Sequence, residues 1–204
     1  MVIRNAIMLA VDVVLLPERR VADKAIELNR RLVGRFGAEI VLGKERCLPH
    51  ISLAMGCIEE GDVEEIGEVL EEIARKAEIG ALEITGAAVN VNSRGEKVSS
   101  LEVAKSEGLV RLHTEVMERM GRFFKGQART EYIAGEGEVA ETTLEWINNY
   151  REKSSFERFR PHITLGYGEL EGEAFAGEFR MERLALCHLG NHCTCARILW
   201  ATAI

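Results

Sequence analysis

The chain has 204 residues, of which 47% are hydrophobic and 29% are charged. This balance is typical of a globular protein with its own core, and it excludes disordered and fibrous classes. Its 26 basic and 33 acidic residues leave a formal net charge of −7, which argues against a protein that holds long duplex nucleic acid through its phosphates. We therefore expect a single domain over 1–204, and we expect any bound nucleic acid to be short or terminal.

The first apolar run, at 6–16, predicts a buried strand. Asp12 interrupts it and no small-residue cleavage site follows, so it does not read as a signal peptide. No apolar stretch reaches the roughly 18 residues that a membrane span needs, and we expect no membrane partner. The five cysteines are an odd number in a chain of this size, which favours free thiols in a reducing cytoplasm.

Along the rest of the chain, helical and strand periodicities alternate. Pro17 is expected at the first position of a helix that Gly37 ends. Gly190-Asn191 indicates a two-residue turn between the last two strands. In chain order, the predicted segments are strand 6–16, helix 17–36, strands 39–43 and 51–55, helix 59–77, a hairpin of strands 82–91 and 98–103, helices 107–124 and 139–153, and strands 163–167, 178–189 and 193–203. Hairpins mixed with helices favour an α+β fold with mainly antiparallel sheets.

Two segments, about half the chain apart, share the pattern P-H-I-[S/T]-L-x-x-G. The first begins at Pro49 and the second at Pro161. Two of the three prolines of the chain thus occupy the same place, directly before a histidine. Internal repetition of this kind indicates two similar lobes related by approximate two-fold symmetry.

Within each repeat, a histidine and a hydroxyl residue stand two positions apart, so a strand points both to one face. His50 pairs in this way with Ser52, and His162 with Thr164. Two imidazoles can supply the acid and the base for in-line attack at phosphorus, while hydroxyls donate to the phosphate oxygens. We therefore expect His50 and His162 to be catalytic and Ser52 and Thr164 to bind phosphate, with either histidine able to be the acid. No metal is expected, because two histidines under-fill a zinc site.

The motifs His50-Ile51-Ser52 and His162-Ile163-Thr164 resemble the signature of the two-histidine (2H) phosphoesterase superfamily, in particular its LigT-like 2′-5′ RNA ligase and cyclic phosphodiesterase branch. The resemblance implies a bilobal LigT-like fold with pseudo-two-fold symmetry around a central cleft. It also implies a cofactor-independent enzyme that opens the 2′,3′-cyclic phosphate end of a small nucleotide or RNA to a 2′-phosphate, and that can join ends through a 2′-5′ linkage. Many members carry a basic residue after the second motif, where this chain has Gly166-Tyr167-Gly168-Glu169.

Other interpretations of the sequence remain. The same cleft could serve a non-catalytic module that binds nucleotides or RNA ends. A Cys/His cluster near the C-terminus could hold zinc, although the absence of a C-x-x-C pair favours packed thiols. His113 is expected to be packed inside a helix, and a basic stretch in the same region is either a solvated surface or a substrate contact. The cluster comprises Cys187, His188, His192, Cys193 and Cys195, and the basic stretch comprises Arg111, Arg119, Arg122, Lys125 and Arg129.

Overall fold

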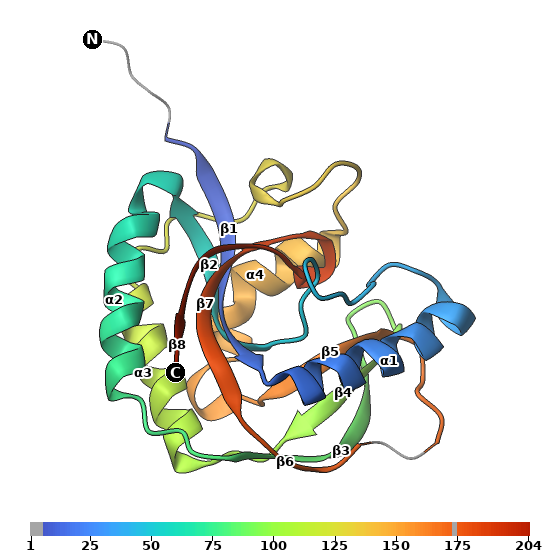
Figure 1. The fold of residues 1–204 in the computed structure, drawn as a ribbon. Helices are drawn as coiled ribbons and strands as arrows, with labels where there is room; N and C mark the ends of the chain where they lie inside the picture. The colour runs from blue at the N-terminus through green and yellow to red at the C-terminus, as the bar shows by residue number, and fades with distance from the viewer. Residues whose placement is uncertain (1–5, 173–174) are drawn as a thin grey trace.

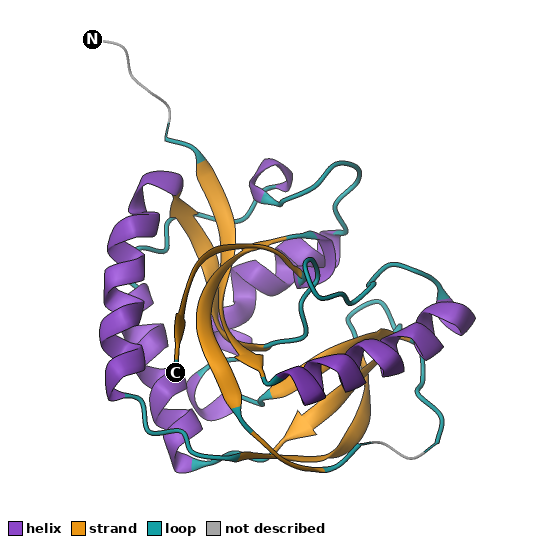
Figure 2. Ribbon diagram, viewed as in Figure 1, coloured by secondary structure: helices purple, strands orange, loops and turns teal. Residues whose placement is uncertain are grey.

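The computed structural model describes residues 6–172 and 175–204, whose strands form two antiparallel sheets with helices packed against them (Figures 1 and 2). The strands are β1 Met8–Pro17, β2 Ile51–Glu59, β3 Leu82–Val91, β4 Lys97–Val103, β5 His162–Tyr167, β6 Gly177–Phe179, β7 Met181–Leu189 and β8 Cys195–Ala203. The α-helices are α1 Arg19–Phe36, α2 Val63–Lys76, α3 Glu107–Met120 and α4 Glu141–Lys153.

Each sheet has four strands. Sheet 1 has the order β2-β1-β7-β8, and sheet 2 has the order β5-β4-β3-β6. The strands that carry the repeated motif, β2 and β5, are therefore both edge strands, and they contact each other where the sheets meet. Helices α2 and α3 cover the outer face of sheet 1, while α1 packs on sheet 2 along β5 (Figure 1). The expected α+β architecture with antiparallel sheets is confirmed.

Strand β1 is buried on both faces, because alternate residues enter different apolar clusters. Val11, Val13 and Leu15 belong to the main core under the helices. Val14 and Leu16 point the other way, into a smaller cluster that includes Ala185, Cys187 and Cys195. We call this second side the inner face of sheet 1, and Asp12 lies on it because it is two residues from Val14.

The start of α1 differs from the prediction. Pro17 is the last residue of β1, opposite Met181, and not the first residue of the helix. The Glu18 N–H donates to the carbonyl of Arg180, which keeps the chain extended past the proline. The end of the helix is as predicted, since Gly37 follows it with a φ of 114°, a backbone conformation that favours glycine.

The predicted strand 39–43 is not a strand. Its backbone is bound by the buried side chain of Asn29, whose amide donates to the carbonyl of Ile40 and whose oxygen accepts from the N–H of Leu42. The same amide donates to the carbonyl of Leu165 in β5. A buried side chain therefore satisfies backbone groups that a neighbouring strand would otherwise pair with.

Two predictions near the C-terminus are also corrected. The predicted strand 178–189 is divided at Arg180: β6 pairs with β3 in sheet 2, and β7 pairs with β1 in sheet 1. The predicted two-residue turn is instead a 3-10 turn over Asn191–Cys193, and it sets Leu189 opposite Cys195 and His188 opposite Arg197. The Asn191 side chain holds this turn by accepting from the Ala140 N–H and the Thr143 hydroxyl. None of the described helices combines the length and apolar character needed to span a membrane.

Candidate functional site

The two repeats have the same local backbone. In β2, a bulge leaves Leu53 without a partner in β1, because Val13 and Val14 oppose Ala54 and Ser52. In β5, a bulge at the matching motif position leaves Leu165 unpaired, because Ser99 and Ser100 oppose Gly166 and Thr164. A bulge bends an edge strand and re-aims its side chains. The repeat therefore reproduces a shape as well as a sequence.

The two imidazoles are also held in the same way. His50 Nδ1 lies 2.7 Å from the carbonyl oxygen of Leu48, and His162 Nδ1 lies 2.8 Å from that of Arg160. Since a carbonyl only accepts hydrogen bonds, Nδ1 carries the proton in each ring. In the neutral form, each Nε2 then keeps a lone pair and is free to accept a proton from a ligand.

The two histidines are close enough to interact. Burial lowers the pKa of His50; its bond to the Leu48 carbonyl partly offsets this, and the charge of His162 lowers it further. The His50 side chain is 12% exposed, whereas His162 stands at the start of its edge strand with greater access to solvent. The strands that carry the four motif residues, β2 and β5, contact each other.

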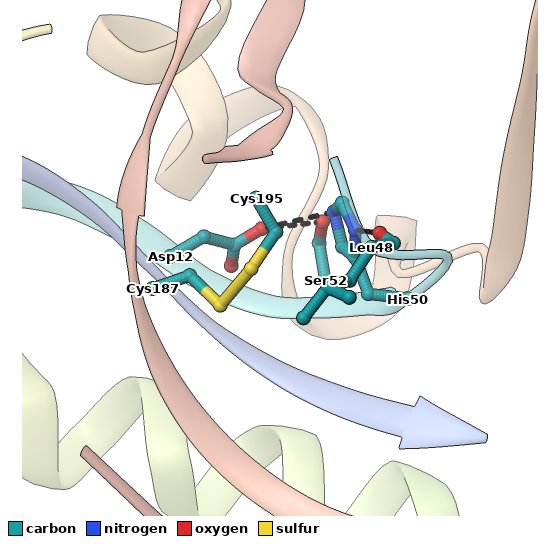
Figure 3. The surroundings of a disulfide bond; sticks show 6 residues. All are labelled: Asp12, Leu48, His50, Ser52, Cys187 and Cys195. Carbon is teal, nitrogen blue, oxygen red and sulfur yellow. Dashed lines mark hydrogen bonds and ion pairs between the residues drawn. A yellow bond between two sulfur atoms is a disulfide. The ribbon is translucent and has the colours of Figure 1, made fainter. Parts of the chain in front are cut away.

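Asp12 is a candidate site residue that the sequence analysis did not identify (Figure 3). Its side chain is fully buried, its Oδ2 lies 2.6 Å from Ser52 Oγ, and the same oxygen is 3.8 Å from His50 Nε2. Burial raises its pKa well above the ordinary value, against the smaller lowering effects of the Ser52 hydroxyl and the Ala54 N–H. The alternation of side chains along β1 places Asp12 on the inner face. Which β2 residues it contacts depends on the register between β1 and β2, which the sequence does not give.

The sheet 2 side of the site is built differently. Glu102 on β4 stands opposite His162, and Ser100 stands opposite Thr164, so these four side chains share a face. The Ser100 hydroxyl donates to Glu102 at 2.9 Å. In contrast to Asp12, this carboxylate is only partly buried. The two lobes therefore place acids of different character beside similar motifs.

The inner face of sheet 1 also carries a disulfide between Cys187 and Cys195, so the prediction that all the cysteines are free thiols is wrong (Figure 3). The pairing follows from the longer 3-10 turn, which puts both sulfurs on one face. Cys187 lies opposite Asp12 in the neighbouring strand. The carbonyl of Cys195 accepts from the N–H of Leu48, whose own carbonyl anchors His50.

The other residues weighed in the sequence have different roles. Among residues 6–172 and 175–204, no group of three or more His, Cys, Asp or Glu side chains is arranged to hold a metal ion. His113 is packed as expected: it is fully buried, stacks on Phe159 and accepts from the Phe156 N–H. The basic stretch forms ion pairs with glutamates and an aspartate, mostly of α2 and the turn before it, on the outer side of sheet 1. It does not line the site.

A hollow of about 550 Å³ lies beyond the far end of β5 and contains none of the four motif residues. Tyr167 and His192 line it, joined by a 3.0 Å hydrogen bond. Tyr167 opposes Val98, two residues from Ser100, so it shares the β5 face with His162 and Thr164. Cations around the hollow are paired with glutamates, as in the bond between Lys97 and Glu169.

The fold has known counterparts among solved structures. The structure of E. coli LigT in its apo form is 13% identical, with a TM-score of 0.51, over 96% of this chain and 97% of that one. E. coli LigT complexed with 3′-AMP is 12% identical, with a TM-score of 0.50, over 95% and 96%. A structure described as a phosphoesterase is 13% identical, with a TM-score of 0.51, over 96% and 98%. At this identity, the likeness establishes the LigT-like fold.

A search of curated proteins finds no match to this sequence. The family model of the 2′-5′ RNA ligase superfamily, however, matches residues 43–197, a span that contains both histidine motifs, both bulged edge strands and the disulfide. The chain therefore belongs to the 2′-5′ RNA ligase superfamily of 2H phosphoesterases.

Proposed function

We propose that this protein is a metal-independent phosphoesterase that opens 2′,3′-cyclic phosphate ends of nucleotides or RNA to a 2′-phosphate, and that it can join ends through a 2′-5′ linkage in reverse. The observation that carries the proposal is the matched anchoring of two imidazoles, each with a hydroxyl residue two positions on, on edge strands that contact each other. A binding site alone would not need two titratable rings held in the same tautomer. The E. coli LigT complex with 3′-AMP supports a nucleotide as the ligand class.

The two histidines take different roles in this proposal. Burial and the charge of His162 favour the neutral form of His50, so His50 Nε2 accepts the proton of the attacking water. The water oxygen bonds to phosphorus, the bond from phosphorus to the ribose 3′ oxygen breaks, and His162 donates its proton to that oxygen. The products are a 2′-phosphate and a 3′-hydroxyl. Two protons move and no electron is exchanged, so the step needs no cofactor.

A cation for longer substrates is available on sheet 1. Arg183 is exposed and lies on the inner face, because it alternates with the core residue Leu184 and is two positions from Ala185. It forms no ion pair with the other described residues. Strand spacing and residue rise put its Cα about 12 Å from that of Ser52. This position supports a contact between Arg183 and a phosphate farther along an RNA strand.

The experiment is turnover of a 2′,3′-cyclic nucleotide by purified wild type, His50→Ala and His162→Ala. Each variant is expected to lose at least about 10²-fold in kcat, the lower range for removing a general acid or base. His113→Ala, which changes a buried histidine outside the site, is the matched control and is expected to keep its kcat if folded. Unchanged turnover in either motif variant would refute the proposal.

The pH dependence of kcat/KM tests the proposed roles of His50 as base and His162 as acid. The wild-type profile is expected to be bell-shaped, with an acid limb below about pH 6.5 because the pKa of His50 is lowered. The alternative function, a non-catalytic module for nucleotides or RNA ends, predicts binding of cyclic and 2′-phosphorylated nucleotides with no turnover at any pH.

A further inference from the structure

Asp12 is a carboxyl group in an apolar setting with no cation bonded to it. Its Oδ1 is buried and has no hydrogen-bond partner among the described residues, and its Oδ2 is bonded to Ser52. The nearby Ala54 N–H lowers the pKa of Asp12, but by less than burial raises it. Among residues 6–172 and 175–204, the ring of His50, 3.8 Å away, is the one group paired with Asp12 that could carry a positive charge, and burial disfavours that charge. An ionised carboxylate with an unpartnered buried oxygen is strongly disfavoured, whereas a neutral carboxylic acid is tolerated far better.

The groups behind Asp12 also favour the neutral acid. Tyr150 of α4 donates to the backbone carbonyl of Ser52 at 3.2 Å. Burial raises the pKa values of Tyr150 and of the Cys193 thiol in the 3-10 turn, so both stay neutral beside Asp12. On the β7 and β8 side, the neighbour is the Cys187–Cys195 disulfide, which does not titrate. None of these elements presents a cation that would stabilise a carboxylate.

The protonation state of Asp12 decides what the Ser52 hydroxyl can do. A carboxylate only accepts, so it would hold the Ser52 hydrogen and place a negative charge beside the phosphate site. A protonated Asp12 can instead donate from Oδ2 to Ser52 Oγ. The Ser52 hydrogen is then free to point outward, as a donor to a phosphate oxygen.

We propose that Asp12 is a positioning residue that acts as a neutral acid, donating to Ser52 so that Ser52 donates to the substrate phosphate. This inference rests on the proposed function for the identity of the anion. It assigns a role in substrate binding to a residue outside both histidine motifs. The two lobes then differ in function. In the second lobe, the strand position that corresponds to Asp12 is occupied by Val98, which cannot donate a hydrogen bond from its side chain.

The first arm of the test needs no substrate. The carbon-13 resonance of the Asp12 carboxyl, assigned by its loss in Asp12→Asn, is followed as the pH is changed. A protonated Asp12 at pH 7 is the expected result, with the exposed Asp23 ionised in the same spectra as the control. An ionised Asp12 at pH 7 would overturn the inference, whatever the protein is shown to catalyse.

The second arm measures binding of a 2′,3′-cyclic nucleotide by calorimetry in a His162→Ala background, where turnover does not interfere. Asp12→Asn keeps a donor for Ser52 and is expected to bind within about threefold of the unchanged Asp12. Asp12→Ala removes that donor and is expected to bind about tenfold or more weakly, in line with the loss of a hydrogen bond to a charged group. The inference is overturned if the three proteins bind the nucleotide with equal affinity, or if Asp12→Asn binds it no more tightly than Asp12→Ala.

The kinetic parameters separate this role from a structural one. In the wild-type background, Asp12→Ala is expected to raise KM more than it lowers kcat, and Asp12→Asn to restore KM. A fall in kcat alone, with no rescue by asparagine, contradicts the assignment. If wild type turns over no cyclic nucleotide while the carboxyl resonance shows a neutral Asp12, the proposed function has failed and the protonation state still stands.

Discussion

Replacing Asp12 with asparagine should stabilise the protein, increasingly so as the pH rises. The carboxyl has no hydrogen-bond partner for Oδ1 in the described structure, and burial raises its pKa well above the ordinary value. In the unfolded chain, an aspartate titrates near pH 3.9. Between these two values the folded protein binds the proton more tightly, so wild-type stability falls as the pH increases.

The size of the effect follows from linkage. Through this one carboxyl, each pH unit in that window removes about 1.4 kcal/mol from the stability of the wild type, a loss that Asp12→Asn does not have. With Asp12 protonated at pH 7, as proposed above, the difference in free energy of unfolding between variant and wild type should widen by about 2.7 kcal/mol from pH 5 to pH 7. For a chain of this size, each kcal/mol moves Tm by roughly 2–4 °C.

Urea unfolding of both proteins at half-unit pH steps would measure this difference, because groups common to both cancel. Asp23→Asn is the control. That carboxyl is exposed, and its hydrogen bond with Lys44 lowers its pKa. The stability that Asp23 contributes is therefore present at pH values above its unfolded-state pKa and is lost only on acidification. A difference for Asp12→Asn that stays constant from pH 5 to pH 7 would show that Asp12 is already ionised and would refute the reasoning.

Three further outcomes are expected. Arg183→Ala should weaken binding of an RNA oligonucleotide about tenfold while leaving KM for a cyclic mononucleotide within about twofold, since a charge-assisted contact is lost only for the longer ligand; equal losses for both ligands would contradict this placement. Reduction of the disulfide, which joins residues eight positions apart, should lower the free energy of unfolding by about 2 kcal/mol and raise the thiol titre from three to five; five thiols before reduction would rule out the bond. Asn29→Ala should destabilise the protein by about 2–4 kcal/mol, because three buried backbone groups lose their partner; a loss below about 0.5 kcal/mol in urea unfolding would show that water replaces the side chain.

Several features of the site could be predicted from local periodicity. Strand alternation placed His50 with Ser52 and His162 with Thr164 on common faces, and the repeated motif indicated two related lobes. The hairpin over 82–103 and the four helices also follow from apolar spacing and turn residues, with ends shifted by a few positions. These features depend on residues within one element, so a single segment contains the information.

Other predictions failed where distant segments decide the outcome. The expected two-residue turn is instead a 3-10 turn held by Asn191, and Cys187 and Cys195 on the strands it joins form a disulfide. Arg180 is locally compatible with one long strand, yet the chain changes sheets there because β3 and β1 offer separate edges. Asp12 could be seen only as a break in an apolar run, since Ser52 lies 40 positions away.

For this protein, the sequence by itself determined the motif pair, the class of the fold and the chemical character of the candidate site. The tertiary structure decided the register of β1 against β2, the bulge positions and the disulfide. These features determine that Asp12 faces Ser52 and His50. The physical reason is that an amphipathic period is a property of one segment, while the protonation of a buried carboxyl depends on every segment packed around it.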